Sequence, residues 1–275
     1  MCSTFRVSTT LEHTKSRVAV AIPAYNESDG IAEFLIEIDA TLSPVVESLV
    51  IVVVDDCSTD GTPEVVESVR DQLKGDLVVH STARNSGQGP TMLEGYRRAL
   101  DTGAEYILAV DGDGQFLGTD LRRVLVLLRD GGDGVCGVRR FRYDPWFRMI
   151  MTRVLRVYIN MFFGVPTRDS NCPLRGYRAK LLDELLQWVP DGSLVPNVQL
   201  AILAARRGAT LVEVDVNHRV RRGASTSGTM WTSRSQFGVI KRLLVFTWKA
   251  LLESVRFHRY VNSGMRPPVS SRGSH

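Results

Sequence analysis

The chain has 275 residues, of which 44% are hydrophobic and 23% charged, as in an ordinary globular protein. This composition excludes a wholly disordered chain, and a formal net charge of +4 gives no reason to expect a nucleic-acid partner. The four cysteines are widely spaced and form no CxxC pair, which argues against a disulfide framework and a zinc site.

Nothing in the sequence predicts secretion or a membrane span. The first residues lack the apolar core of a signal peptide, and there is no uninterrupted run of about 18 apolar residues. We therefore expect a cytoplasmic protein that reaches any lipid substrate peripherally, at the inner face of the membrane. Arginines concentrate in 139–178 and 206–259, which fits an anionic substrate or an anionic membrane surface. Solvated helix faces explain any single arginine equally well.

After a flexible arm at 1–16, strand and helix patterns alternate. Short apolar runs predict strands at 17–22, 49–54, 77–80, 106–110 and 134–138. Amphipathic spacing predicts helices between them, at 28–43, 62–74, 90–103 and 119–128, the last capped by Thr119. Continuous apolar strands that alternate with helices predict a mostly parallel sheet flanked by helices on both faces, an α/β Rossmann-like arrangement.

Beyond residue 139 the alternation becomes less regular. The patterns predict helices at 178–188 and 195–207, a strand at 210–216 and an amphipathic C-terminal helix at 231–261, followed by a disordered tail at 262–275. Aromatic residues and arginines are mixed in 141–163 and again in the C-terminal helix. Each segment could lie in lipid headgroups or cover the sheet, and the C-terminal helix offers a homodimer contact as a third use.

Unusual polar residues follow three of the predicted strands. The first strand leads into Pro23 to Glu27, the second into Asp55 and Asp56, and the fourth into Asp111-Gly112-Asp113. The carboxyl ends of parallel strands meet at one edge of the sheet, where ligands bind. We therefore expect these residues to lie close together.

The chemistry of this edge points to a diphosphate held by a metal ion. The sequence has neither a GxGxxG turn after the first strand nor a GxxxxGK[ST] loop, which disfavours nicotinamide enzymes and ordinary kinases or GTPases. A diphosphate without a glycine-rich cradle needs another source of positive charge, and Mg²⁺ or Mn²⁺ bound by a few carboxylates supplies it. Asp-x-Asp is common in turns, but its position after a buried strand favours a metal site at Asp111 and Asp113.

Four segments together resemble the signatures of family 2 glycosyltransferases with the GT-A fold. They are Pro23 to Glu27, Val53 to Thr62, Arg84 to Gly87 and Asp111 to Gln115. The Asp-x-Asp-x-Gln form is similar to that of the dolichyl- and polyprenyl-phosphate mannose synthase branch. The resemblance implies a glycosyltransferase domain at 17–230, with a nucleotide-sugar half at 17–140 and an acceptor half at 141–230.

The resemblance also implies roles for single residues. Those implied to bind the nucleotide-sugar are Pro23, Ala24, Tyr25, Glu27, Asp55, Asp56, Arg84, Gly87, Asp111 and Asp113. The implied metal ligands are Asp111, Asp113 and Gln115. The implied contacts to acceptor or phosphate are Arg139, Arg153, Arg221, Arg222 and Ser225. The implied catalytic residues are Asp113, Asp169, Arg139 and Arg153.

The loop at 218–225 matches its family pattern, Arg-x-x-Gly-x-Ser, only in part. Val220 stands three residues before Gly223, where the pattern has arginine. The choice among Arg219, Arg221 and Arg222 as the phosphate contact therefore stays open.

The acceptor class is inferred from a missing carboxylate. Transfer to a hydroxyl needs a general base, which in the resembled family often lies at the head of a helix in the second half of the domain. Segment 193–200 contains no acidic residue. A lipid phosphate is already ionised near neutral pH, so we expect transfer of a sugar from a GDP- or UDP-sugar to a polyprenyl phosphate at the membrane surface.

Two alternatives remain. One is transfer to a hydroxyl of a small metabolite or glycan, with Asp169 or Asp191 as the base. The other is a non-catalytic nucleotide-sugar-binding protein on the same fold.

Overall fold

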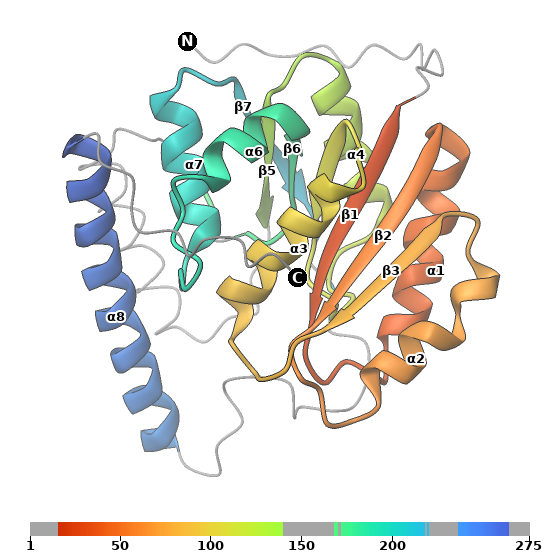
Figure 1. Cartoon of the computed structure of the whole chain (residues 1–275), viewed down its shortest axis with the longest axis horizontal. Helices are drawn as coiled ribbons and strands as arrows, with labels where there is room; N and C mark the ends of the chain where they lie inside the picture. The colour runs from red at the N-terminus through yellow and green to blue at the C-terminus, as the bar shows by residue number, and fades with distance from the viewer. Residues whose placement is uncertain (1–15, 140–167, 170–171, 218, 220–235, 264–275) are drawn as a thin grey trace.

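The computed structural model describes residues 16–139, 168–169, 172–217, 219 and 236–263. They form a seven-stranded sheet with helices on both faces (Figure 1). The α/β Rossmann-like fold that the alternation of strands and helices predicts is thereby confirmed. The predictions for 1–15, 140–167, 220–235 and 264–275 lie outside the described residues.

The sheet has the strand order β3-β2-β1-β4-β6-β5-β7. Neighbouring strands are parallel except at β6, which runs antiparallel to both β4 and β5. The strands are β1 (Arg17–Ala24), β2 (Ser48–Asp55), β3 (Asp76–Ser81), β4 (Tyr106–Ala109), β5 (Gly134–Arg139), β6 (Arg175–Arg178) and β7 (Leu211–Val216). All but β6 agree with the predicted strands to within a few residues.

Strand β6 is the element that the sequence did not predict. Its four residues, Arg-Gly-Tyr-Arg, contain no apolar run and are too few to show an alternating pattern. Its neighbours in space leave no room for a side chain at Gly176, where an added Cβ would lie 2.5 Å from Val124 and 3.0 Å from Leu108. Close packing under α4 therefore requires glycine here, in a position that reads as a loop in the sequence.

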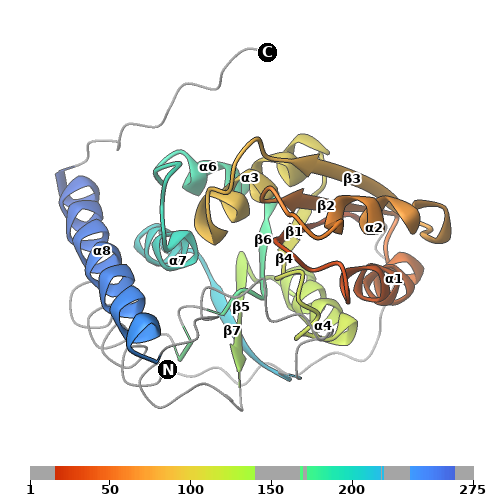
Figure 2. The ribbon, with the colours of Figure 1, turned by 90° about the horizontal axis from the view of Figure 1, so that it is seen from below.

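The helices lie in two layers, one on each face of the sheet (Figure 2). In β1, Val18, Val20 and Ile22 pack on the side of α1 and α4, whereas Ala19 and Ala21 pack on the side of α3, α6 and α7. The helices are α1 (Ile31–Leu42), α2 (Thr62–Ser68), α3 (Gln88–Asp101), α4 (Gly118–Arg129), α6 (Ala179–Leu186), α7 (Pro196–Arg206) and α8 (Gln236–Ser263), with short 3₁₀ helices at Ser43–Val45 and Arg70–Gln72.

The start of α4 differs from the prediction. Thr119 was expected to cap this helix, but α4 begins at Gly118, and no side chain of its own N-cap residue bonds to it. The backbone N–H of Gly118 instead donates to the Glu37 side chain on α1 at 2.8 Å. The capping acceptor comes from a distant element, so the local sequence could not reveal it.

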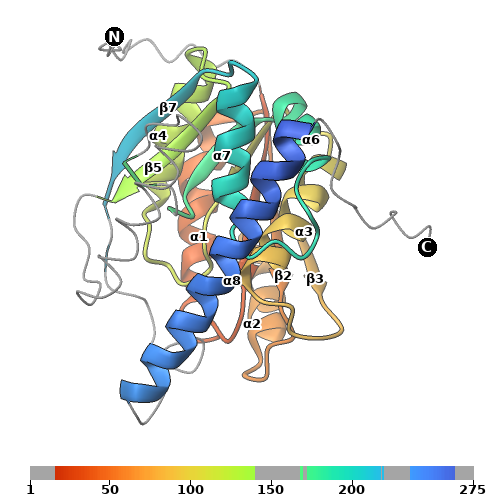
Figure 3. The same ribbon diagram turned by 90° about the vertical axis from the view of Figure 1, so that its left-hand side faces the viewer.

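Helix α8 lies at the periphery, beside α7 (Figures 1 and 3). It was predicted as the C-terminal amphipathic helix, and its described bounds, Gln236–Ser263, agree closely with that prediction. Among the described helices, none is long and apolar enough to cross a membrane.

Candidate functional site

The carboxyl ends of β1, β2 and β4 lie at one edge of the sheet, at the bottom of Figure 1. The loops after β1 and β2 are fastened to one another there. The N–H of Asn26 donates to the Ser58 hydroxyl and the N–H of Thr59 donates to the Asn26 side chain, both at 2.9 Å. Asn26 has a φ of 53°, a left-handed conformation that asparagine tolerates. The N–H of Glu27 donates to Thr62 at 2.9 Å. The predicted nucleotide residues of 23–27 are therefore held firmly beside the end of β2.

Asp55 is the last residue of β2, and only one of its two carboxylate oxygens has a hydrogen-bond partner in the described part of the chain. Its side chain is 2% exposed, and its Oδ2 accepts the N–H of Ser58 at 3.1 Å. Its Oδ1 is buried and has no hydrogen-bond partner within the described residues. An unsatisfied carboxylate oxygen is costly, so a donor on a bound ligand would be favourable here.

Asp56 has a structural role that the sequence did not indicate. Its two carboxylate oxygens accept the N–H groups of Ser86 and Gly87, each at 2.8 Å. These bonds hold the loop that carries the predicted residues Arg84 and Gly87 against the end of β2. The contact of Asp56 with base or ribose stays a prediction. At the start of α2 a different aspartate serves the helix, since Oδ1 of Asp60 accepts the N–H of Thr62 at 3.0 Å.

The segment after β4 carries the predicted metal ligands. The N–H of Gly112 donates to the carbonyl of Pro23 at 3.2 Å, which fixes the turn against the end of β1. Asp113 accepts the N–H of Gln115 at 3.0 Å, and Gly114 adopts a φ of 65°. The three predicted ligands Asp111, Asp113 and Gln115 thus belong to one tight turn at the carboxyl edge.

Asp111 carries the signature of a crowded acidic site. Desolvation, followed by the negative charge of Asp113, raises the pKa of Asp111 from its usual 3.8 to about 7. Its two oxygens each accept a hydrogen bond at 3.0 Å from Gln88, the first residue of α3. Sequence reasoning missed Gln88, because it lies 23 positions from Asp111 in the sequence and only the fold brings the two side chains together.

The donor set fits a hard divalent cation. Within the described residues no group of three or more His, Cys, Asp or Glu side chains could hold a metal. Two aspartates that repel one another, with an amide oxygen at Gln115, do suit Mg²⁺ or Mn²⁺ that keeps other positions for phosphate and water. The residues present therefore fit the metal inferred from the sequence.

Arg139 and Asp169 form a pair that the sequence did not foresee. Arg139 at the end of β5 donates from Nε to Oδ2 of Asp169 at 2.8 Å and from Nη2 to Oδ1 at 3.2 Å. Asp169 is 3% exposed, and the Arg139 side chain is 12% exposed. Such a two-pronged pair holds both side chains in fixed orientation. The other predicted phosphate contacts, Arg153, Arg221, Arg222 and Ser225, lie outside the described residues.

Arg219 contacts the turn at 111–115 through hydrogen bonds. Its N–H donates to the carbonyl of Gln115 at 2.9 Å, its Nε donates to the carbonyl of Gly114, and its Nη2 donates to Glu37 at 2.8 Å. Its guanidinium carbon lies 6.0 Å from the ring centre of Phe34. Of the arginines around the loop at 218–225, this one supports the turn from the side of α1.

A carboxylate does reach the head of α7, although segment 193–200 has none. Glu253 of α8 accepts the Ser193 hydroxyl at 2.6 Å, the N–H of Leu194 at 3.0 Å and the Gln199 amide at 2.7 Å. Sequence reasoning missed it because it comes from a helix more than fifty residues further along. These three hydrogen bonds hold the Glu253 carboxylate in place, so that it joins α8 to the head of α7.

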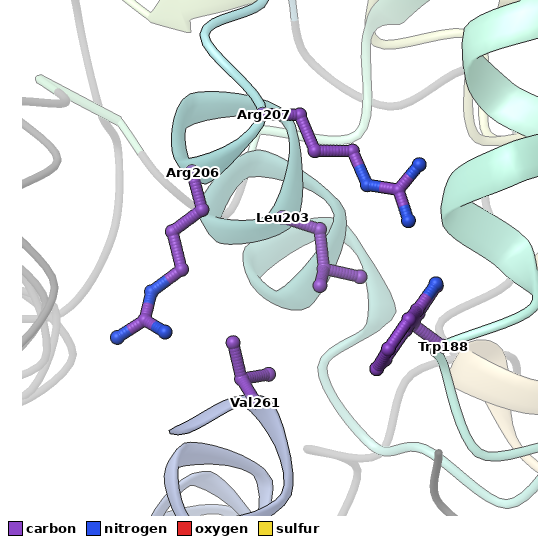
Figure 4. A pocket seen from close by; sticks show the side chains of 5 residues that line it. All are labelled: Trp188, Leu203, Arg206, Arg207 and Val261. Atoms are coloured by element: carbon purple, nitrogen blue, oxygen red, sulfur yellow. The ribbon is translucent and has the colours of Figure 1, made fainter. Parts of the chain in front are cut away.

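A shallow pocket of about 370 Å³ lies at the other end of α7 (Figure 4). Leu203, Arg206 and Arg207 line it from α7, with Trp188 and Val261. Arg207 lies over the Trp188 ring and bonds to Glu184 at 2.9 Å. The pocket includes none of the predicted site residues, so we place the functional site at the carboxyl edge.

Comparison with known proteins identifies the family of the chain. The family model for glycosyl transferase family 2 matches residues 19–186, which include the carboxyl ends of β1, β2, β4 and β5. The undecaprenyl-phosphate 4-deoxy-4-formamido-L-arabinose transferase of Aeromonas hydrophila is 28% identical over 214 residues, 78% of this chain and 63% of that protein. The protein of the same name from Proteus mirabilis is 26% identical over 75% of this chain and 61% of its own length. The chain thus spans less than two thirds of the length of these two relatives.

Solved structures share the fold. Glucosyl-3-phosphoglycerate synthase from Mycobacterium tuberculosis, in complex with Mn²⁺, UDP and glucosyl-3-phosphoglycerate, has a TM-score of 0.62 at 15% identity and covers 98% of this chain and 88% of its own. A mannosyltransferase from Pyrobaculum calidifontis, in complex with GDP-Man and Mn²⁺, has a TM-score of 0.57 at 22% identity and covers 81% of this chain and 62% of its own. The chain is a glycosyltransferase of family 2 with the GT-A fold.

Proposed function

We propose that the enzyme transfers a sugar from a nucleoside-diphosphate sugar, GDP- or UDP-linked, to a polyprenyl phosphate, with inversion at the anomeric carbon. The two curated relatives above are undecaprenyl-phosphate sugar transferases by name, which supports this acceptor class. Family membership makes the chain an enzyme rather than a non-catalytic sugar-nucleotide binder.

The observation that carries the donor half is the pair of aspartates after β4. Asp111 and Asp113 follow β4, beside the end of β1. The pKa of Asp111 is raised first by desolvation and then by the negative charge of Asp113, and a bound cation would stabilise both carboxylates. Asp55 offers a buried acceptor without a partner in the described part of the chain, suited to an N–H of the base. We assign the nucleotide to this edge, between 23–27, 84–87 and the two aspartates.

Asp111, Asp113 and Gln115 would hold Mg²⁺ or Mn²⁺. When bound, the ion supplies Lewis-acid stabilisation of the departing nucleoside diphosphate. The presence of Mn²⁺ in complexes of the two solved structures supports a divalent metal, without deciding between the ions. Gln88 donates to Asp111 and would hold its carboxylate in orientation.

The proposed reaction is a single displacement. A phosphate oxygen of the acceptor forms a bond to the anomeric carbon as the bond from that carbon to the diphosphate oxygen breaks. The leaving diphosphate takes the electron pair, and configuration at the carbon inverts. Arg139, Arg153, Arg221, Arg222 and Ser225 are the proposed contacts to acceptor and phosphate, and the role of Asp169 is to hold Arg139 in place.

The rival acceptor, a hydroxyl, needs a free carboxylate as base. Asp169 is bound on both oxygens by Arg139, and Asp191 is paired with Arg97. Glu253 is occupied by three donors at the head of α7. These pairings favour an acceptor that arrives already ionised.

The acceptor class is tested with Asp169→Asn. Hydroxyl transfer through this residue as base predicts complete loss of activity. The proposed role predicts weakened transfer to undecaprenyl phosphate, through a looser Arg139. Near-full activity of this variant would remove Asp169 from the mechanism.

The donor site is tested by thermal shift with GDP, UDP and dTDP, each with and without Mn²⁺. A ligand that binds only the folded state raises stability by RT ln(1 + [L]/Kd), so one base should stand out and should need the metal. Asp113→Asn should remove the metal-dependent part of the shift, while Asp183→Asn on the exposed face of α6 should keep it. No shift with any nucleotide would overturn the proposed function.

A further inference from the structure

Helix α8 has an inner face that packs on the enzyme. Ala250, Ser254 and Phe257 are 6%, 4% and 2% exposed. Ala250 and Phe257 belong to the apolar cluster formed with α3, α6 and α7. Together with the hydrogen bonds of Glu253, these contacts fix which side of α8 faces inward.

The opposite face of α8 is apolar and exposed. Val245, Trp248, Leu252 and Val255 are 47%, 63%, 40% and 37% exposed, and their spacing of three, four and three residues places them on one side of a helix. Among side chains that the structure describes, the only other large hydrophobic residue so exposed is Val78, on β3. Exposed apolar side chains thus gather on this helix instead of being scattered.

The charges of α8 are divided between the same two faces. Lys249, Arg256 and Arg259 are exposed. Glu253 is the only acidic residue of the sequence between 236 and 263, and its carboxylate is turned inward to Ser193, Leu194 and Gln199. The outer face in its described part therefore combines apolar side chains with positive charge.

We propose that this outer face of α8, formed by Val245, Trp248, Leu252 and Val255 with Lys249, Arg256 and Arg259, is the surface by which the enzyme lies on an anionic lipid bilayer. An interfacial helix buries an apolar face at the level of the headgroups, where tryptophan is favoured, while cations bind anionic lipid. A second copy of the chain fits less well. A two-fold contact through this face would bring the three cations of each helix together without an acidic partner from either α8.

The lipid-binding face is joined to the donor site through α7 and α3. Glu253 holds Ser193, and the Ser193 carbonyl packs so closely on Gly89 that an added Cβ would lie 2.0 Å from it. The residue before Gly89, Gln88, donates a hydrogen bond to Asp111. In Figure 1 the first turns of α8 lie at the same end of the molecule as the carboxyl edge of the sheet. A bilayer against α8 would therefore lie near the edge where the proposed lipid acceptor must enter.

Vesicle co-sedimentation of the full chain, without donor or acceptor, tests the proposal. The probes are neutral phosphatidylcholine vesicles and vesicles in which about a quarter of the lipid is phosphatidylglycerol. We expect binding to the anionic vesicles only, and we expect it to weaken between about 0.1 and 0.5 M salt. Trp248→Ser/Val255→Ser and Lys249→Gln/Arg256→Gln/Arg259→Gln should each lower the partition coefficient roughly tenfold or more.

Val78→Ser is the matched control, because Val78 and Val255 are both 37% exposed valines. It should bind vesicles as the wild type does. Equal binding of the α8 variants and the wild type, or no binding of the wild type to anionic vesicles, would overturn the proposal. Loss of a dimer in Trp248→Ser/Val255→Ser with unchanged vesicle binding would assign the face to a second copy instead. Nucleotide thermal shifts report separately on the proposed function and on folding of the variants.

Discussion

Asp56 is an acidic side chain whose two oxygens each bind a backbone N–H, at Ser86 and Gly87. Asparagine has the same shape, but its NH₂ group would face an N–H donor. We expect Asp56→Asn to lower the free energy of unfolding by about 1–3 kcal/mol, the cost of a buried polar group left without a partner. Urea denaturation measures this change. The exposed Asp183→Asn should change stability by less than about 0.5 kcal/mol, and an equal effect of the two variants would contradict the role of Asp56.

Asp111 makes the metal-free enzyme sensitive to pH. Its pKa is raised from 3.8 to about 7, so between these values the folded state binds a proton that the unfolded state lacks. The contribution of Asp111 to the stability of the metal-free protein should therefore rise as pH falls from about 8 to about 4, by up to about 1.4 kcal/mol for each pH unit below 7, and level off below the unfolded-state pKa of 3.8. Thermal unfolding of chelator-treated protein measures it. The difference between wild type and Asp111→Asn isolates this residue, and parallel pH profiles would exclude the effect.

The same proton opposes metal binding. A carboxylate ligand must lose its proton first, so the Kd for Mn²⁺ should increase about tenfold for each pH unit below 7. Titration calorimetry at pH 6, 7 and 8 checks this dependence. A Kd that stays constant over this range would mean that Asp111 is not a ligand or is already ionised.

At the scale of the elements, α7 and α8 are joined by one carboxylate. Glu253 faces three donors, on Ser193, Leu194 and Gln199. In Glu253→Gln one acceptor becomes a donor, so we expect a loss of about 1–3 kcal/mol and easier opening of α8. Faster hydrogen exchange in the second half of α8 measures that opening. Glu64→Gln on the exposed side of α2 is the control, and unchanged exchange in Glu253→Gln would show that the other contacts of α8, its apolar face and the Arg206–Asn262 bond, suffice to hold it.

At the scale of the whole molecule, contacts between elements distant in sequence separate what the sequence could predict from what it could not. The strand ends at Glu27, Asp56 and Asp111 follow from local patterns, because parallel strands carry their carboxyl ends to one edge. Strand β6 could not be predicted, since its neighbours β4 and β5 supply the apolar surroundings that its own four residues lack. The roles of Glu253 and Gln88 depend on contacts between elements distant in sequence. No periodicity reports such contacts, so the gathering of these strand ends at one edge was predictable and the bonds that support them were not.

Arg219 shows how the second half of the chain completes the first. It binds the carbonyls of Gly114 and Gln115 and, 182 positions away, the side chain of Glu37. Lysine keeps the charge but lacks the planar fork that reaches two acceptors at once. We expect Arg219→Lys to loosen the turn at 111–115. Mn²⁺-dependent nucleotide binding should weaken about tenfold, and the free energy of unfolding should fall by about 1–2 kcal/mol. Thermal shift across a Mn²⁺ titration measures both.

Arg206→Lys provides the control, since Arg206 also bonds to a side chain, that of Asn262, but at the far end of α7. It should leave the Mn²⁺ titration unchanged. If Arg219→Lys bound metal and nucleotide as the wild type does, the turn at 111–115 would owe its shape to its own glycines and to β1. If both variants weakened binding equally, the effect would be one of general stability, because only Arg219 touches the turn.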